Sequence, residues 1–166
     1  MTSTVNKGSC FRIGIPRVSK SDLPANTTNL VKGTTNPEES IQSKILLIDN
    51  DTLMLTALAK QLTEWGCQVV TAKDKNSARE QFTGDNFDGV PPSLIIADYH
   101  LEDGENGVDV AQQLIKSQQW QSPCIICSAD PSETVRQHTS DAKFNFVRKP
   151  IKALALKRLV RQLISR

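Results

Sequence analysis

Four polar residues, each placed directly after a short strand-like segment, carry the groups that could do chemistry in this chain. Two are aspartates, one is a serine and one is a lysine: Asp49, Asp98, Ser128 and Lys149. Parallel β-sheets place ligand sites at the carboxyl ends of their strands, so these side chains could meet in one crevice. Two carboxylates, a hydroxyl and an ammonium suit the binding of a divalent cation and the acceptance of a phosphoryl group.

The elements that must position these groups form a regular alternation of strand and helix patterns from Lys44 onward. Short apolar segments predict five strands, at 45–48, 68–72, 94–97, 124–127 and 144–147. Capped or amphipathic segments predict five helices, at 52–65, 75–82, 108–118, from Pro131 onward and at 151–164. This alternation predicts an α/β fold with a doubly wound parallel sheet. The flavodoxin-like (βα)5 strand order 2-1-3-4-5 makes the first, third, fourth and fifth strands neighbours, which gathers the four polar groups.

Composition and charge exclude several classes of protein. No apolar stretch approaches the roughly 20 residues of a membrane span, and the chain start has no signal-peptide segment, which predicts a soluble, cytoplasmic protein. Residues 80–109 hold acids but no Lys or Arg, whereas 142–166 hold Lys and Arg but no acids. No DNA-reading helix or aromatic interleaving accompanies the basic segment, so we interpret it as a solvated helix face and expect no nucleic-acid partner.

Two of the four cysteines, Cys124 and Cys127, have the CxxC spacing of redox and zinc sites. They lie in a predicted strand, where positions three apart point to opposite faces. No second cysteine pair or histidine cluster completes a zinc site. We therefore expect buried structural thiols.

The first 43 residues differ from the regular part of the chain. Gly8–Pro16 alternates apolar and other residues, which predicts one isolated strand within an extended segment at 1–18. Residues 19–43 are rich in Ser, Thr and Asn, with Pro and Gly among them, which predicts a linker. The compact domain is therefore expected at 44–166.

From Lys44 to Arg166 the chain resembles the receiver domain of two-component response regulators. The resemblance rests on an acidic residue after the first strand, an aspartate after the third, Ser-Ala after the fourth and Lys-Pro after the fifth. It implies a phosphorelay signalling module that accepts a phosphoryl group from phosphohistidine, with self-catalysed transfer and dephosphorylation. It also implies Mg²⁺ as the cofactor, a histidine kinase or histidine phosphotransfer domain as the partner, and allows a homodimer.

The resemblance gives each matching residue a role. Asp98 is the implied phosphoacceptor, and Lys149 and Ser128 are the implied contacts of the phosphoryl group. The implied metal ligands are two side chains after the first strand, the phosphoacceptor and one backbone carbonyl: Asp49, Asn50, Asp98 and the carbonyl of His100.

Further positions have implied regulatory roles. Ser128 and Phe146 form the implied switch pair, which responds to phosphorylation. His100 and Asp130 are placed where side chains could gate water, so substitutions there are expected to alter dephosphorylation.

One departure from the family pattern keeps alternatives open. Asn50 stands where a second acidic metal ligand is usual, and its amide oxygen can coordinate but brings no charge. A degenerate receiver that binds a partner without phosphorylation is therefore one alternative. Another is a phosphatase of the haloacid dehalogenase type, because Asp49-Asn50-Asp51 is a DxD after a strand and would make Asp49 the nucleophile.

The amino-terminal segment suggests a larger context. Gly8–Pro16 is similar to the final strand of the ATP-binding domain of sensor histidine kinases. If so, the chain is the carboxyl-terminal receiver of a hybrid histidine kinase, and the parent protein is the kinase. The nucleotide-binding motifs of that domain are absent here, so this chain is not expected to bind ATP.

Overall fold

The computed structural model describes residues 2–4, 8–10, 41–83 and 88–165, which divide between two units, Met1–Thr34 and Thr35–Arg166. In the first unit, β1 (Thr2–Thr4) pairs with β2 (Gly8–Cys10) in an antiparallel ladder. The strand that was predicted to be isolated therefore pairs with β1. This partner strand has only three residues, which is too few to show an alternating pattern in the sequence. The rest of that predicted strand, and the linker predicted at 19–43 up to residue 40, lie outside the described residues.

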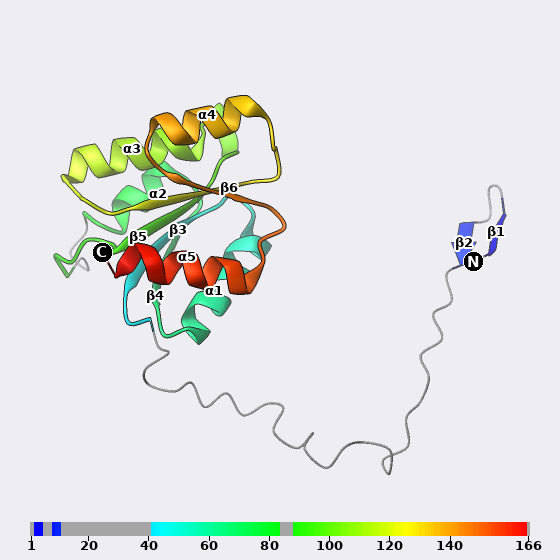
Figure 1. The fold of residues 1–166 in the computed structure, drawn as a ribbon, viewed down its shortest axis with the longest axis horizontal. Coiled ribbons are helices and arrows are strands. Elements are labelled where there is room, and N and C mark those ends of the chain that lie inside the picture. Colours follow the sequence, from blue (N-terminus) through cyan, green and yellow to red (C-terminus); the bar gives the residue numbers. More distant parts are fainter. Residues whose placement is uncertain (1, 5–7, 11–40, 84–87, 166) are drawn as a thin grey trace, which may run out of the picture. The chain divides into compact units, whose positions relative to one another are not determined.

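The second unit is built on one five-stranded parallel sheet (Figure 1). Its strands are β3 (Lys44–Ile48), β4 (Gln68–Ala72), β5 (Leu94–Asp98), β6 (Cys124–Ser128) and β7 (Asn145–Arg148). They lie in the order β4-β3-β5-β6-β7, and every neighbouring pair is parallel. The predicted flavodoxin-like order 2-1-3-4-5 is confirmed.

Helices cover both faces of this sheet. They are α1 (Thr52–Glu64), α2 (Lys75–Glu80), α3 (Gly107–Gln118), α4 (Glu133–Asp141) and α5 (Ala153–Ile164). Figure 1 shows α2, α3 and α4 on one side of the sheet and α1 and α5 on the other. Each side has its own apolar core, one containing side chains of α2 and α3 and the other side chains of α1 and α5.

Local sequence explains where the first two helices begin. The Asp51 carboxylate accepts hydrogen bonds from the amides of Leu53 and Met54, which caps the exposed amino terminus of α1. Asp74 and Ser77 form a reciprocal capping box at the start of α2. Gly66 follows α1 with a φ of 90°, a conformation that glycine adopts without strain.

Two helices begin later than predicted. α4 starts at Glu133, because the Ser132 hydroxyl rather than Pro131 provides the cap by accepting from the amide of Val135. α5 starts at Ala153, whereas Ile151 precedes the helix and packs against the core shared by α1 and α5.

The compact unit also includes residues before the predicted boundary at 44. Ile41 is buried, and its amide donates a hydrogen bond to the Trp65 carbonyl at 2.7 Å. Cys124 and Cys127 are buried unbonded thiols that belong to the cores on opposite sides of the sheet, as predicted. Among the described residues, no helix has both the length and the apolar character to cross a membrane.

Candidate functional site

The four polar groups that follow the strands are brought to one edge of the sheet. Asp98 and Ser128 are the last residues of β5 and β6, and Asp49 and Lys149 directly follow β3 and β7. The Lys149 ammonium lies 3.0 Å from Asp49 Oδ2 and 3.0 Å from Asp98 Oδ1. Two carboxylates that are far apart in the chain, Asp49 and Asp98, therefore share the ammonium of Lys149, which is 100 positions from Asp49.

The charges in this cluster do not balance. Two carboxylates face one ammonium, and their side chains are only 7% and 12% exposed, for Asp49 and Asp98 respectively. Burial raises the pKa of the Asp98 carboxyl, and this outweighs the lowering by the Lys149 ammonium. Burial alone would lower the pKa of Lys149, but its hydrogen bonds to Asp98 and Asp49 raise it above the ordinary lysine value. The site therefore holds a fixed cation and has a surplus of negative charge.

A divalent cation fits this surplus and the oxygen donors present. In the described part of the chain no three His, Cys, Asp or Glu side chains cluster as a metal site. The donors here are instead the carboxylates of Asp49 and Asp98, which meet at the same ammonium, and Asn50 directly follows Asp49 in the chain. Asp51 does not join them, because its carboxylate caps α1. Carboxylate, amide and carbonyl oxygens are ligands that Mg²⁺ accepts, so the donor set fits this ion.

Ser128 connects the site to the start of α4. Its side chain is fully buried, and its hydroxyl oxygen accepts a hydrogen bond from the amide of Asp130 at 3.1 Å. The Asp130 carboxylate in turn accepts from the amide of Ser132, the residue that caps α4. A movement of the Ser128 hydroxyl would therefore pull on the loop that leads into α4.

Two other predicted residues lie outside the carboxylate cluster. Phe146 is a half-buried residue of β7, and the Arg136 guanidinium of α4 lies 5.4 Å from the centre of its ring. The His100 side chain is exposed, and its backbone forms a bridge with Asn106 across the loop after β5.

Gly107 is a site residue that the sequence did not single out. A Cβ at this position would lie 2.0 Å from the Asp98 carbonyl oxygen, so only glycine fits without a shift of the backbone. The Gly107 amide also donates to the Tyr99 carbonyl at 2.9 Å. This glycine holds the first turn of α3 against the backbone that carries Asp98. Nothing in the local sequence signals this close approach.

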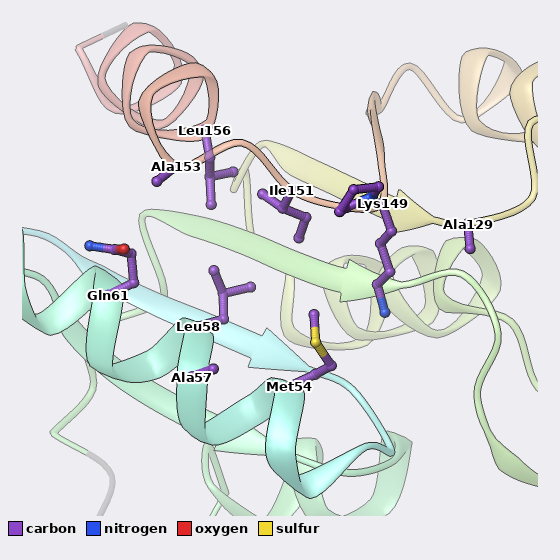
Figure 2. A pocket seen from close by; sticks show the side chains of 10 residues that line it. Met54, Ala57, Leu58, Gln61, Ala129, Lys149, Ile151, Ala153 and Leu156 are labelled. Atoms are coloured by element: carbon purple, nitrogen blue, oxygen red, sulfur yellow. The ribbon is translucent and has the colours of Figure 1, made fainter. Parts of the chain in front are cut away.

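An apolar pocket of about 550 Å³ adjoins the carboxylate cluster. It lies between α1 and α5, and Lys149 is one of its lining residues (Figure 2). Figure 2 shows the Lys149 side chain extending past the end of β5, while Ala57, Leu58 and Leu156 line the pocket further along the two helices. The edge of the sheet that carries the two carboxylates therefore lies beside an apolar surface.

Comparison with known proteins identifies a matching family and solved structures with the same fold. A family model described as the response regulator receiver domain matches residues 45–161. No match to the chain was found among curated proteins.

Solved structures share the same fold. A response regulator receiver protein from Pseudoalteromonas atlantica matches with a TM-score of 0.62 and 22% identity, over 74% of this chain and 97% of that chain. A CheY-like receiver domain protein from Methanospirillum hungatei matches with a TM-score of 0.64 and 18% identity, over 75% and 95%. The non-phosphorylated HemR receiver domain from Leptospira biflexa matches with a TM-score of 0.62 and 23% identity, over 75% and 96%. At these identities the likeness establishes the fold alone.

Proposed function

The chain belongs to the response regulator receiver domain family, whose members are phosphoacceptors in two-component signalling, and we propose that its phosphoacceptor is Asp98, acting with Mg²⁺. The observation that carries this assignment is the position of the Lys149 ammonium, 3.0 Å from both Asp98 and Asp49. Of the two carboxylates, Asp98 is the last residue of a strand in the middle of the sheet, between β3 and β6. The Asp49 carboxylate also accepts a hydrogen bond from the Asp51 amide at 2.9 Å. This bond orients the carboxylate, which suits a residue that holds a ligand.

In the proposed reaction an Asp98 carboxylate oxygen forms a bond to phosphorus, and the bond between phosphorus and the donor's histidine nitrogen breaks. The electron pair of the broken bond stays on that imidazole, which takes a proton from solvent. The approach of one anion to another costs about 4 kcal/mol for unit charges 4 Å apart at an effective dielectric near 20. Lys149 offsets this cost from a fixed position, and Mg²⁺ bound by Asp49, Asn50, Asp98 and the carbonyl of His100 would supply the remaining positive charge.

The other residues act after transfer. We propose that the Ser128 hydroxyl donates a hydrogen bond to the phosphoryl group and that Phe146 turns inward as Ser128 moves, as a switch pair. Ser128 is fully buried at the strand end next to Asp98, which supports its role. His100 and Asp130 follow the ends of β5 and β6, where their side chains would control the approach of water to the acyl phosphate.

The first prediction tests the acceptor and the metal together. With acetyl phosphate and Mg²⁺, the purified chain is expected to gain close to one phosphoryl group per molecule, mapped by mass spectrometry to the peptide that contains Asp98. Removal of Mg²⁺ with a chelator is expected to abolish the gain, because one ammonium cannot neutralise two carboxylates and a phosphoryl group.

Other outcomes of that experiment would support one of the two alternative functions. Label on Asp49 would indicate a phosphatase of the haloacid dehalogenase type. Incorporation far below one group per molecule at saturating donor and Mg²⁺ would indicate a degenerate receiver, in which Asn50 leaves the metal site too weak.

We further propose that the phosphodonor is a histidine kinase or a histidine phosphotransfer domain, and that a helix of this donor docks in the pocket between α1 and α5. Transfer requires the phosphohistidine to lie within bonding distance of Asp98, and this apolar pocket adjoins the carboxylate cluster through Lys149. An apolar helix face laid into such a groove is a common mode of recognition. The similarity of Gly8–Pro16 to a kinase strand supports a hybrid kinase as the parent protein.

Docking in this pocket gives a second prediction. Ala57→Glu places a charge on its α1 wall and is expected to slow transfer from a phosphohistidine domain by about tenfold, roughly 1.4 kcal/mol. Phosphorylation by acetyl phosphate, which needs no docking, should be unchanged. Thr56→Glu is the matched control, because Thr56 is the neighbouring exposed residue of α1 and lies outside this pocket. Equal slowing of both reactions by Ala57→Glu would count against the docking site.

A further inference from the structure

Helix α4 is held to the domain by few apolar contacts. Its nine residues are mostly polar, and only Val135 and Thr139 are buried. By comparison, α3 buries five residues along twelve. A helix with so little buried apolar surface opens or shifts at low cost, unless polar contacts hold it.

Such polar contacts are centred on His138, near the carboxyl end of α4. Its Nδ1 lies 3.2 Å from the Tyr99 hydroxyl oxygen, and its Nε2 lies 3.3 Å from Asp109 Oδ1 in the first turn of α3. The other oxygen of Asp109 accepts from the Asn106 side-chain amide at 2.7 Å. In the neutral tautomer that has its proton on Nε2, beside the carboxylate, Nδ1 is the acceptor and the Tyr99 hydroxyl donates. We call the three linked side chains of Tyr99, His138 and Asp109 the latch.

The latch reaches the backbone of the proposed phosphoacceptor. Tyr99 directly follows Asp98; its amide donates to the Cys127 carbonyl at 2.8 Å, and its carbonyl accepts from the Gly107 amide at 2.9 Å. The ring is half-buried and packs against the core on the side of α3. With both backbone groups bonded and the ring packed, the hydroxyl of Tyr99 has a fixed position relative to Asp98.

α4 is therefore held at both ends by groups that lead to the site. At its start, hydrogen bonds connect Ser128 to Asp130 and Asp130 to the cap residue Ser132. Near its end, the latch ties it to Tyr99 and α3. A pull on Ser128 by a phosphoryl group at Asp98 would act on the first attachment, and the second would resist it.

We propose that Tyr99 and His138 are positioning residues that hold α4 in its unphosphorylated arrangement, and that phosphorylation must release the latch. This proposal rests on the function proposed above. Loss of the bond between Tyr99 and His138 removes about one net hydrogen bond from the unphosphorylated state only. The population of the phosphorylation-competent arrangement, and with it the rate of phosphorylation, should then rise about fivefold.

The test uses Tyr99→Phe, His138→Gln and the double variant in the full chain. The initial rate of phosphorylation by acetyl phosphate at saturating Mg²⁺ is expected to rise about fivefold in Tyr99→Phe and at least fivefold in His138→Gln, which also removes the contact with Asp109. The double variant should be no faster than His138→Gln, because that variant already lacks the bond to Tyr99. Amide hydrogen exchange of α4 should be faster than in wild type without ligand and equal to wild type with beryllofluoride and Mg²⁺ bound. The control is Gln137→Ala, which removes an exposed side-chain hydrogen bond within α4, from Gln137 to Asp141, and should change neither measurement.

A merely structural role would give a different result, with slower phosphorylation or with faster α4 exchange that persists in the beryllofluoride complex. Either result, or unchanged rate and exchange in Tyr99→Phe, would overturn the latch while leaving Asp98 as the acceptor. No phosphoryl incorporation by wild type would overturn the proposed function and the latch together.

Discussion

The Asp98→Asn variant is expected to incorporate no phosphoryl group from acetyl phosphate or from a phosphohistidine domain at any Mg²⁺ concentration. The amide that replaces the carboxylate has the same shape, so it can still accept a hydrogen bond from Lys149, which now lies 3.0 Å from Asp98 Oδ1. An amide oxygen is a poor nucleophile, and the substitution also removes one charge from the proposed metal site. Intact mass after incubation with donor measures the loss directly.

The same variant should fold, and its stability should depend on pH in a predictable way. The pKa of Asp98 is raised, mainly by burial, so between the unfolded value near 3.9 and the raised value the native state binds more protons than the unfolded state. The free energy of unfolding of the wild type therefore loses a contribution as pH rises through this window, and Asp98→Asn does not. The difference in unfolding free energy, variant minus wild type, should be more positive at pH 7 than at pH 4.

Urea unfolding at the two pH values measures this difference, and Glu80→Gln, at an exposed acid of α2, is the control for a general effect of charge removal. Phosphoryl incorporation by a folded Asp98→Asn variant would show that the acceptor is another residue. An equal stability difference at both pH values would show that burial does not raise the pKa of the Asp98 carboxyl.

Sequence patterns were enough to predict the sheet and the placement of four polar groups at one edge of it, for physical reasons. The strands Leu94–Asp98 and Cys124–Ser128 are buried on both faces, so their apolar runs are continuous and easy to locate. The handedness of crossovers and the flavodoxin-like strand order then fix which carboxyl ends are neighbours. The distance between Lys149 and Asp49 follows from topology rather than from any local signal.

The features that were missed depend on contacts through space. Ile41 is part of the core although its neighbours in sequence resemble a linker, because a single apolar residue shows no periodicity. The close approach of Gly107 to Asp98 depends on how the first turn of α3 lies on the strand. The contact between Tyr99 and His138 joins residues 39 positions apart, and no sequence pattern around either residue predicts it.

Lys149→Met is expected to lower the rate of phosphorylation by acetyl phosphate by about 100-fold, close to 3 kcal/mol in the barrier. Methionine keeps most of the length and apolar body of the side chain but removes the ammonium that both Asp49 and Asp98 share. Mg²⁺ would remain as the only positive charge near the transferring oxygens. Lys152→Met is the matched control, since Lys152 is an exposed lysine three residues further on, and its rate should match wild type.

Loss of this ammonium should also destabilise the fold at neutral pH, by about 2 kcal/mol, because hydrogen bonds between charged groups are lost and two carboxylates are left facing each other. Without the ammonium, the native state should take up a proton at this pair more readily than the unfolded state. The unfolding free energy of the variant should therefore fall, relative to wild type, as pH rises from 4 to 7, and Mg²⁺ should restore part of it. A phosphorylation rate within threefold of wild type, or a stability loss that is independent of pH and Mg²⁺, would contradict the shared-cation site. The two measurements are independent, because the rate reports the charge beside the transferring phosphoryl group and the stability reports the charge balance of the resting site.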